Sequence, residues 1–216
     1  MFAYKKYMPY PINIKKKDLR MAKYIITQYG GPYGELGAAL RYFNQRYSMP
    51  DEKGKALLTD IATEEFGHVE MICAMVNQLT KGASMKELED AGLDLNYAQH
   101  GLEITPSDVF GVPFSTTGMG FTGDYLADLS EDMAAEEKAR ATYEHLIDLA
   151  TDDDVIQPLL FLRQRELVHF AKFKELYDYY KNKYKKIAKR KLPYQLMKGS
   201  FLIMFILMKW NFQSLL

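Results

Sequence analysis

Apolar residues recur at intervals of three and four positions through four long stretches of the chain. This period is typical of helices that bury one face. The stretches cover about residues 32–47, 51–80, 124–150 and 153–188. The second is the most regular, with a stripe of Leu57, Ile61, Glu65, His68, Ile72, Val76 and Leu79. No segment shows a competing strand pattern, so the sequence predicts an all-α fold.

Capping and helix-breaking residues mark the ends of these stretches. Asp18 can cap a preceding short helix that runs to about Tyr29, and Asp51 can cap the second long helix. Gly30 and Gly31 break the short helix, and Pro32 suits the first position of the next one. Pro9 and Pro11 disfavour helix near the N-terminus, so we expect residues 1–17 to form an extended arm.

Residues 83–121 differ from the rest, because Gly, Pro, Ser and Thr are frequent and only one short helix, about 84–91, is indicated. A long crossover between bundle helices 2 and 3 predicts a ferritin-like four-helix bundle. We expect residues 1–188 to form this domain and residues 189–216 to form a basic and apolar tail. The apolar run 201–208 in that tail is too short to span a bilayer. We favour subunit contact, coat contact or disorder for it over membrane anchoring.

Composition narrows the function classes. The chain has 216 residues with 28 Lys and Arg against 28 Asp and Glu, so its net charge gives no attraction to nucleic acid. A single cysteine, Cys73, excludes an internal disulfide framework, and its apolar neighbours predict a buried core thiol. The N-terminus lacks the apolar core of a secretory signal.

A repeat within the chain carries the candidate chemistry. Two sets of residues are related by a constant offset of 101 positions: Glu35, Glu65 and His68 recur as Glu136, Glu166 and His169. Tyr42 recurs as Tyr143 with the same offset. A Glu-x-x-His pair projects from one helical face, and four buried carboxylates need cations. One such pair is a weak signal, but the doubled set predicts a paired metal centre of Mn or Fe in the bundle core.

Neighbouring polar residues have less specific interpretations. Tyr42 and Tyr143 either pack in the core or donate a hydroxyl hydrogen to a ligand carboxylate. The remaining candidates are expected to face away from the site or to lie on solvated faces: Glu64, Glu137, Asp60, Asp132, His100 and His145.

With these residues in place, the chain resembles the manganese catalases, especially short members found in the spore coat and encoded with the coat J proteins. The resemblance rests on GGPYGELGAALRYFNQRY (30–47), DIATEEFGHVEMICAMV (60–76), DMAAEEKARATY (132–143) and FLRQRELVHF (161–170). It implies dismutation of hydrogen peroxide to water and oxygen at two manganese ions. It also implies a homo-oligomer, commonly a hexamer, that is synthesised in the cytoplasm and delivered to the spore coat beside other coat proteins.

The resemblance also implies roles that the spacing leaves open. Glu65 would bridge the two ions, Glu35 and His68 would bind one, and Glu136 and His169 would bind the other. Glu166 would act as a general base, and Tyr42 matches a tyrosine behind the ligands. The chain departs from some members in having Ala135 where they have arginine, which puts peroxide affinity or rate in doubt. Alternative functions are a di-iron ferroxidase or peroxidase, and a structural coat protein braced by metal.

Overall fold

The computed structural model describes residues 8–97 and 103–191, with side chains to residue 183. The chain divides into two compact units, residues 1–176 and 177–216, and the candidate site lies wholly in the first. Seven α-helices are described: α1 (Leu19–Ile25), α2 (Thr27–Gly30), α3 (Glu35–Gln45), α4 (Glu52–Leu79), α5 (Met85–Asp90), α6 (Tyr125–Leu149) and α7 (Asp153–Lys191). Within the described residues there is no strand, which confirms the all-α prediction.

Side-chain caps fix the starts of three helices where the sequence predicts them. Asp18 accepts from the amide of Met21 at 3.0 Å, and Asp51 accepts from the amide of Gly54 at 3.3 Å. Asp124 caps α6 in the same way. Each such cap contributes about 1 kcal/mol, because it satisfies an amide that has no partner within the helix.

The start of α3 differs from the prediction, because the helix begins at Glu35 and not at Pro32. The chain turns tightly between α2 and α3, and a Cβ at Gly34 would lie 2.7 Å from the carbonyl oxygen of Gln28. This turn occupies Pro32 and leaves Gly34 as the extended residue before the helix. Glu35 therefore stands at the first position of α3, where the helix dipole favours a carboxylate.

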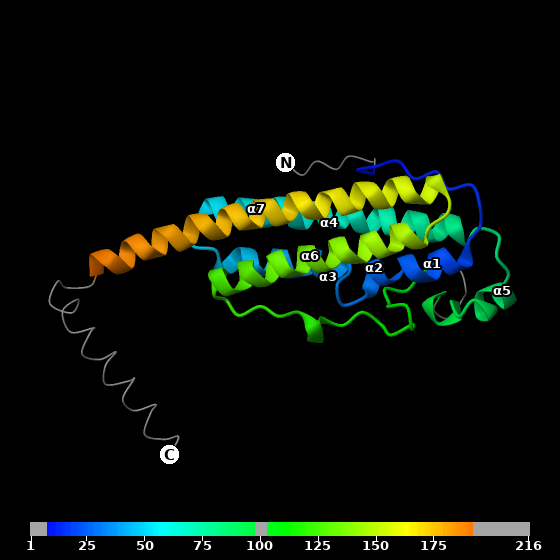
Figure 1. Ribbon diagram of the computed structural model, residues 1–216. Coiled ribbons are helices and arrows are strands. Elements are labelled where there is room, and N and C mark those ends of the chain that lie inside the picture. Colours follow the sequence, from blue (N-terminus) through cyan, green and yellow to red (C-terminus); the bar gives the residue numbers. More distant parts are fainter. Residues whose placement is uncertain (1–7, 98–102, 192–216) are drawn as a thin grey trace, which may run out of the picture. The chain divides into compact units, whose positions relative to one another are not determined.

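Helices α3, α4, α6 and the part of α7 up to Leu176 form the bundle (Figure 1). Polar contacts tie the helices together: Tyr42 of α3 bonds Glu136 of α6, and Arg165 of α7 bonds Glu64 of α4. An apolar core closes the bundle beside the site, and its most buried members include Met21, Ile25, Met71, Ile72, Met75, Leu159 and Leu162. The site thus lies between four helices with hydrocarbon packed beside it.

The described part of the N-terminal arm, residues 8–17, is not helical and packs against α4. The amide of Ile14 donates to Oε1 of Gln78 at 2.6 Å, while Nε2 of Gln78 donates to the carbonyl of Ile12 at 3.1 Å. The side chains of Ile12 and Ile14 are buried. Residues 8–17 are thus free of helix, as Pro9 and Pro11 predict.

The crossover from α4 to α6 contains α5 and the short 3-10 helices η2 (Asp94–Tyr97) and η3 (Thr116–Gly118). Buried Asn96 holds it together by donating to Ser107 Oγ at 2.8 Å and to the carbonyl of Asp108 at 2.9 Å. At Gly30 an added Cβ would lie 2.2 Å from the amide nitrogen of Ser107. The crossover therefore lies directly against the end of α2, as a covering layer over the approach to α3.

Cys73 is only partly buried, so the prediction of a fully buried thiol was wrong. The tail predicted at 189–216 lies outside the described residues from 192 onward. In the described part of the chain, no helix is both long enough and apolar enough to cross a membrane.

Candidate metal centre

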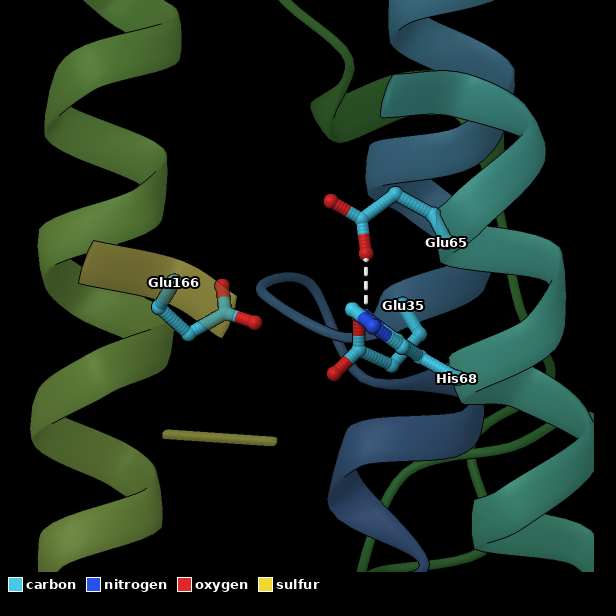
Figure 2. A group of neighbouring side chains, drawn as sticks. All are labelled: Glu35, Glu65, His68 and Glu166. Atoms are coloured by element: carbon cyan, nitrogen blue, oxygen red, sulfur yellow. Dashed lines mark hydrogen bonds and ion pairs between the residues drawn. The ribbon is translucent and has the colours of Figure 1, made fainter. Parts of the chain in front are cut away.

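The structure brings all six residues of the repeat into the centre of the bundle. Their exposed fractions are at most 2%: Glu35 2%, Glu65 0%, His68 0%, Glu136 1%, Glu166 2% and His169 0%. They come from four helices, because α3 and α6 each supply one glutamate while α4 and α7 each supply a Glu-x-x-His pair. Figure 2 shows four of them, with Glu166 pointing across the bundle toward Glu35, Glu65 and His68.

Glu65 lies between the two imidazoles. Its Oε2 is 2.7 Å from Nδ1 of His68, and its Oε1 is 2.9 Å from Nδ1 of His169. The second distance is short, yet neither Oε1 of Glu65 nor Nδ1 of His169 has a partner with hydrogen-bond geometry. One carboxylate therefore presents an oxygen to each half of the site.

The outer glutamates complete two similar groups. Oε2 of Glu35 lies 3.5 Å from Nδ1 of His68, and Oε2 of Glu136 lies 3.5 Å from Nδ1 of His169. Two sets have possible ligand atoms within 4.8 Å of one another: Glu35, Glu65, His68 and Glu166 in one, and Glu65, Glu136 and His169 in the other. Glu65 belongs to both sets. Glu166 is close enough to be a ligand or a neighbouring base, so both roles that the sequence left open remain.

Unpartnered buried atoms test whether these residues fit metal ions. Within the part of the chain that the structure describes, six site atoms have no hydrogen-bond partner: Glu65 Oε1, His68 Nε2, Glu136 Oε2, Glu166 Oε1, and Nδ1 and Nε2 of His169. Each such atom costs about 1–3 kcal/mol in a protein interior. Carboxylate oxygens and imidazole nitrogens are the donors that Mn and Fe accept. The residues present therefore fit divalent metal.

The electrostatics of these side chains are strongly unequal. Burial raises the pKa of Glu35 to about 7, with a further contribution from Glu65. Burial, with the nearby charges of Glu35 and Glu136, raises the pKa of Glu166 well above its usual range. Burial opposes ionisation of Glu65 too, but the two imidazoles outweigh it and lower that pKa. Glu65 is thus held in its charged form, whereas burial favours the protonated forms of Glu35 and Glu166.

Two buried tyrosines connect the halves. The hydroxyl of Tyr42 donates to Oε1 of Glu136, and the hydroxyl of Tyr143 donates to Oε1 of Glu35. Burial raises the pKa of both phenols well above 10, so each remains a neutral donor. Tyr42 also packs edge-on against Phe173, with 4.9 Å between ring centroids. The sequence left core packing and hydrogen bonding to a ligand carboxylate as alternative roles for Tyr42. The structure shows both at this residue.

Glu64 reaches the site although its position on α4 predicts that it faces away. Its Oε2 is 3.2 Å from Nε2 of His169, and its Oε1 is 3.7 Å from Nε2 of His68. Arg165 donates from Nε to Oε1 and from its terminal nitrogen to Oε2 at 3.3 Å. Residues 64 and 165 are themselves 101 positions apart. The same offset that identifies the six site residues could have identified this pair.

Asp132 is another correction. It is fully buried instead of solvated, and its Oδ1 accepts from Nε2 of Gln45 at 2.9 Å. Its place one turn before Glu136 puts it on the inner face of α6. Glu137, Asp60 and His145 are partly or fully exposed, as the sequence predicts. His100 lies outside the described residues.

Comparisons with known proteins agree with this arrangement. A family model described as "Manganese containing catalase" matches residues 1–208. Protein CotJC of Bacillus subtilis (strain 168) is 51% identical over 175 residues, covering 81% of this chain and 92% of that protein. A manganese catalase of Bacillus subtilis is 33% identical over 193 residues, covering 82% and 71%.

A crystal structure of KatB, a manganese catalase from Anabaena, has a TM-score of 0.76 and 35% identity. The match covers 82% of this chain and 80% of that one. This similarity confirms the ferritin-like helical bundle that the sequence predicts.

Proposed function

The chain belongs to the manganese catalase family, and on this premise we propose that it dismutates hydrogen peroxide to water and oxygen at a pair of manganese ions. The observation that carries the proposal is the position of Glu65, with one carboxylate oxygen facing each imidazole at 2.7 and 2.9 Å. Manganese, when bound, supplies the reversible electron transfer that dismutation needs. Glu65 would bridge the ions, Glu35 and His68 would hold one, and Glu136 and His169 would hold the other.

Glu166 is proposed as the base that moves protons. Peroxide must lose protons when it becomes oxygen and must gain them when it becomes water. The Oε1 of Glu166 has no partner, and burial raises its pKa, so this carboxyl can hold a proton and return it to the departing oxygen. Tyr42 would support this chemistry by donating to Glu136, which holds that carboxylate in position.

The test joins metal analysis to oxygen release. Protein produced with manganese and iron both present is analysed for each element, and oxygen release from peroxide is measured per bound ion. The proposal predicts two manganese ions and activity above that of free Mn²⁺. Iron in the site with ferroxidase activity would instead support the di-iron alternative. An inactive protein with two manganese ions would support the structural one.

Two variants then separate binding from proton transfer. Glu65→Gln is expected to lose metal and activity together, whereas Glu166→Gln is expected to keep both ions and turn over more slowly. Glu70→Gln changes an exposed carboxylate on the same helix as Glu65 and serves as the control. Loss of one ion from Glu166→Gln would make Glu166 a ligand and would contradict its role as the base.

We also propose that the protein is a spore-coat component that assembles as a homo-oligomer, hexameric by family resemblance. The 51% identity to Protein CotJC supports this location. In this proposal residues 1–188 form the catalytic domain and residues 189–216 contact other subunits or coat proteins. Immunodetection in extracted spore-coat fractions tests the location, and light scattering tests the oligomer. Detection only in the mother-cell cytoplasm would argue against the proposed location in the spore coat.

A further inference from the structure

Arg41 is a buried arginine whose Nε has no hydrogen-bond partner among the described residues. It lies on α3 one residue before Tyr42, with only 7% of its surface exposed. Among the described residues it makes no hydrogen bond or ion pair, and its Nε is fully enclosed. A guanidinium is charged at any physiological pH, and an unpaired buried charge is costly. The enclosed Nε is therefore a donor that is available to a ligand.

Two cavities meet at this side chain. The smaller, about 20 Å³, is lined by Arg41 together with Glu35, Tyr42, Glu136 and Glu166. That volume holds about one water-sized molecule. The larger, about 250 Å³, lies beneath the crossover and is lined by Arg41 with residues that include Gly37, Val112 and Phe114. Arg41 and Pro32 line both cavities, so they form the boundary between the metal centre and the space under the crossover.

The acidic side chains that line the inner cavity mainly accept hydrogen bonds, so a ligand there also needs a hydrogen-bond donor. Glu35, Glu136 and Glu166 line the inner cavity and offer mainly oxygen acceptors. Asp132 is near enough to sense the charge of Arg41 but is not within ion-pair distance of it. Of the residues that line both cavities, Pro32 has neither an N–H nor a polar side chain, so the guanidinium alone can donate to a ligand there.

We propose that Arg41 is a substrate-binding residue, which donates hydrogen bonds to an oxygen of hydrogen peroxide as the peroxide passes from the crossover cavity to the metal centre. The inference rests on the proposed catalase function. The same donor would bind small anions of similar size, because a charged guanidinium binds anions more strongly than neutral ligands. Bulky hydroperoxides would be excluded by the inner cavity.

The test uses the full-length manganese-loaded protein with Arg41→Met and Arg41→Lys. Oxygen release gives KM and kcat, and calorimetric titration with sodium azide gives a dissociation constant that requires no turnover. Arg41→Met is expected to raise KM and the azide dissociation constant by about tenfold, because one charged hydrogen bond is lost, while kcat changes less than about threefold. Arg41→Lys keeps a charge and a donor, so most of both losses should be rescued. Arg20→Met, which removes an exposed arginine, is the control and should leave both values unchanged.

Several outcomes would overturn the inference. Unchanged KM and azide affinity in Arg41→Met would do so, and so would a fall in kcat alone. If Arg41→Met does not fold, Arg41→Gln, which also removes the charge, takes its place, and wild-type KM and azide affinity in that variant would argue against the proposal. An inactive wild-type protein would refute the catalase proposal, but the azide titration would still decide whether Arg41 binds a small ligand.

Discussion

Replacing Glu35 with glutamine is expected to stabilise the metal-free protein above neutral pH. Burial and Glu65 raise the pKa of Glu35 from 4.5 to about 7. The folded state therefore binds this proton more tightly than the unfolded state does. The stabilising effect of the protonated Glu35 carboxyl is fully present below pH 4.5 and is lost as pH rises through 7. At about 1.4 kcal/mol per pKa unit, ionising Glu35 in the fold costs at most about 3 kcal/mol.

Glutamine carries no charge and still offers an oxygen to the Tyr143 hydroxyl, which donates to Glu35 in the native site. Glu35→Gln should therefore raise the free energy of unfolding by up to about 3 kcal/mol at pH 8, and by less than about 1 kcal/mol at pH 5. Urea unfolding of EDTA-treated protein, followed by circular dichroism at both pH values, measures the difference. Glu70→Gln, an exposed change on α4, should alter neither value.

Manganese should reverse the order of stability. The wild-type protein gains stability from bound ions by mass action, whereas Glu35→Gln lacks a proposed ligand and should gain less. A metal-free Glu35→Gln protein that is less stable than wild type at pH 8 would refute the reasoning. So would a gain of equal size at pH 5 and pH 8, because it would show that the charge of Glu35 is not the cause.

Three further outcomes are expected. Glu64→Gln should weaken manganese binding by about 10–100-fold, because Glu64 contacts both imidazoles at 3.2 and 3.7 Å on the side away from Glu65. Competition with a chelator measures the affinity, and an unchanged value would show that these contacts do not orient the ligands. Gly30→Ala should lower the free energy of unfolding, measured in urea, by about 1–3 kcal/mol, because the new Cβ would lie 2.2 Å from the amide nitrogen of Ser107 in the crossover. Gly118→Ala is the control and should cost far less, because no described atom lies within 4 Å of its added Cβ. Asp132→Asn should stabilise the metal-free protein at neutral pH, because burial raises the pKa of Asp132, and the gain should vanish in acid if ionisation is the reason.

Helix positions and the six site residues could be predicted because they depend on local information. The cap at Asp51 and the stripe on α4 need only the 3.6-residue period and one side chain that accepts an amide hydrogen. The Glu-x-x-His spacing and its repeat after 101 positions then identify polar residues that occupy core positions. The spacing lies within one helix and the repeat is a comparison of two stretches of sequence, so neither requires knowledge of how the helices pack.

The contacts between helices could not be predicted in this way. The period of the apolar residues indicates which face of α4 or α6 is buried. It does not indicate the axial stagger between one helix and its neighbour. That stagger decides that Tyr42 bonds Glu136 and that Tyr143 bonds Glu35, each in the other half of the repeat. Asp132 is a different case, because its place one turn before Glu136 already indicates the buried face of α6.

An all-α bundle with six polar residues in its core follows from amino-acid order, because helical period and motif spacing can be read without knowing how the helices pack. The packed structure was needed to show that Glu65 lies between both imidazoles and that Glu64 reaches them from the other side. It was also needed to show that Arg41 lies beside the site, with its Nε unpartnered among the described residues. These arrangements depend on the separation, rotation and stagger of packed helices, which distant side chains fix jointly.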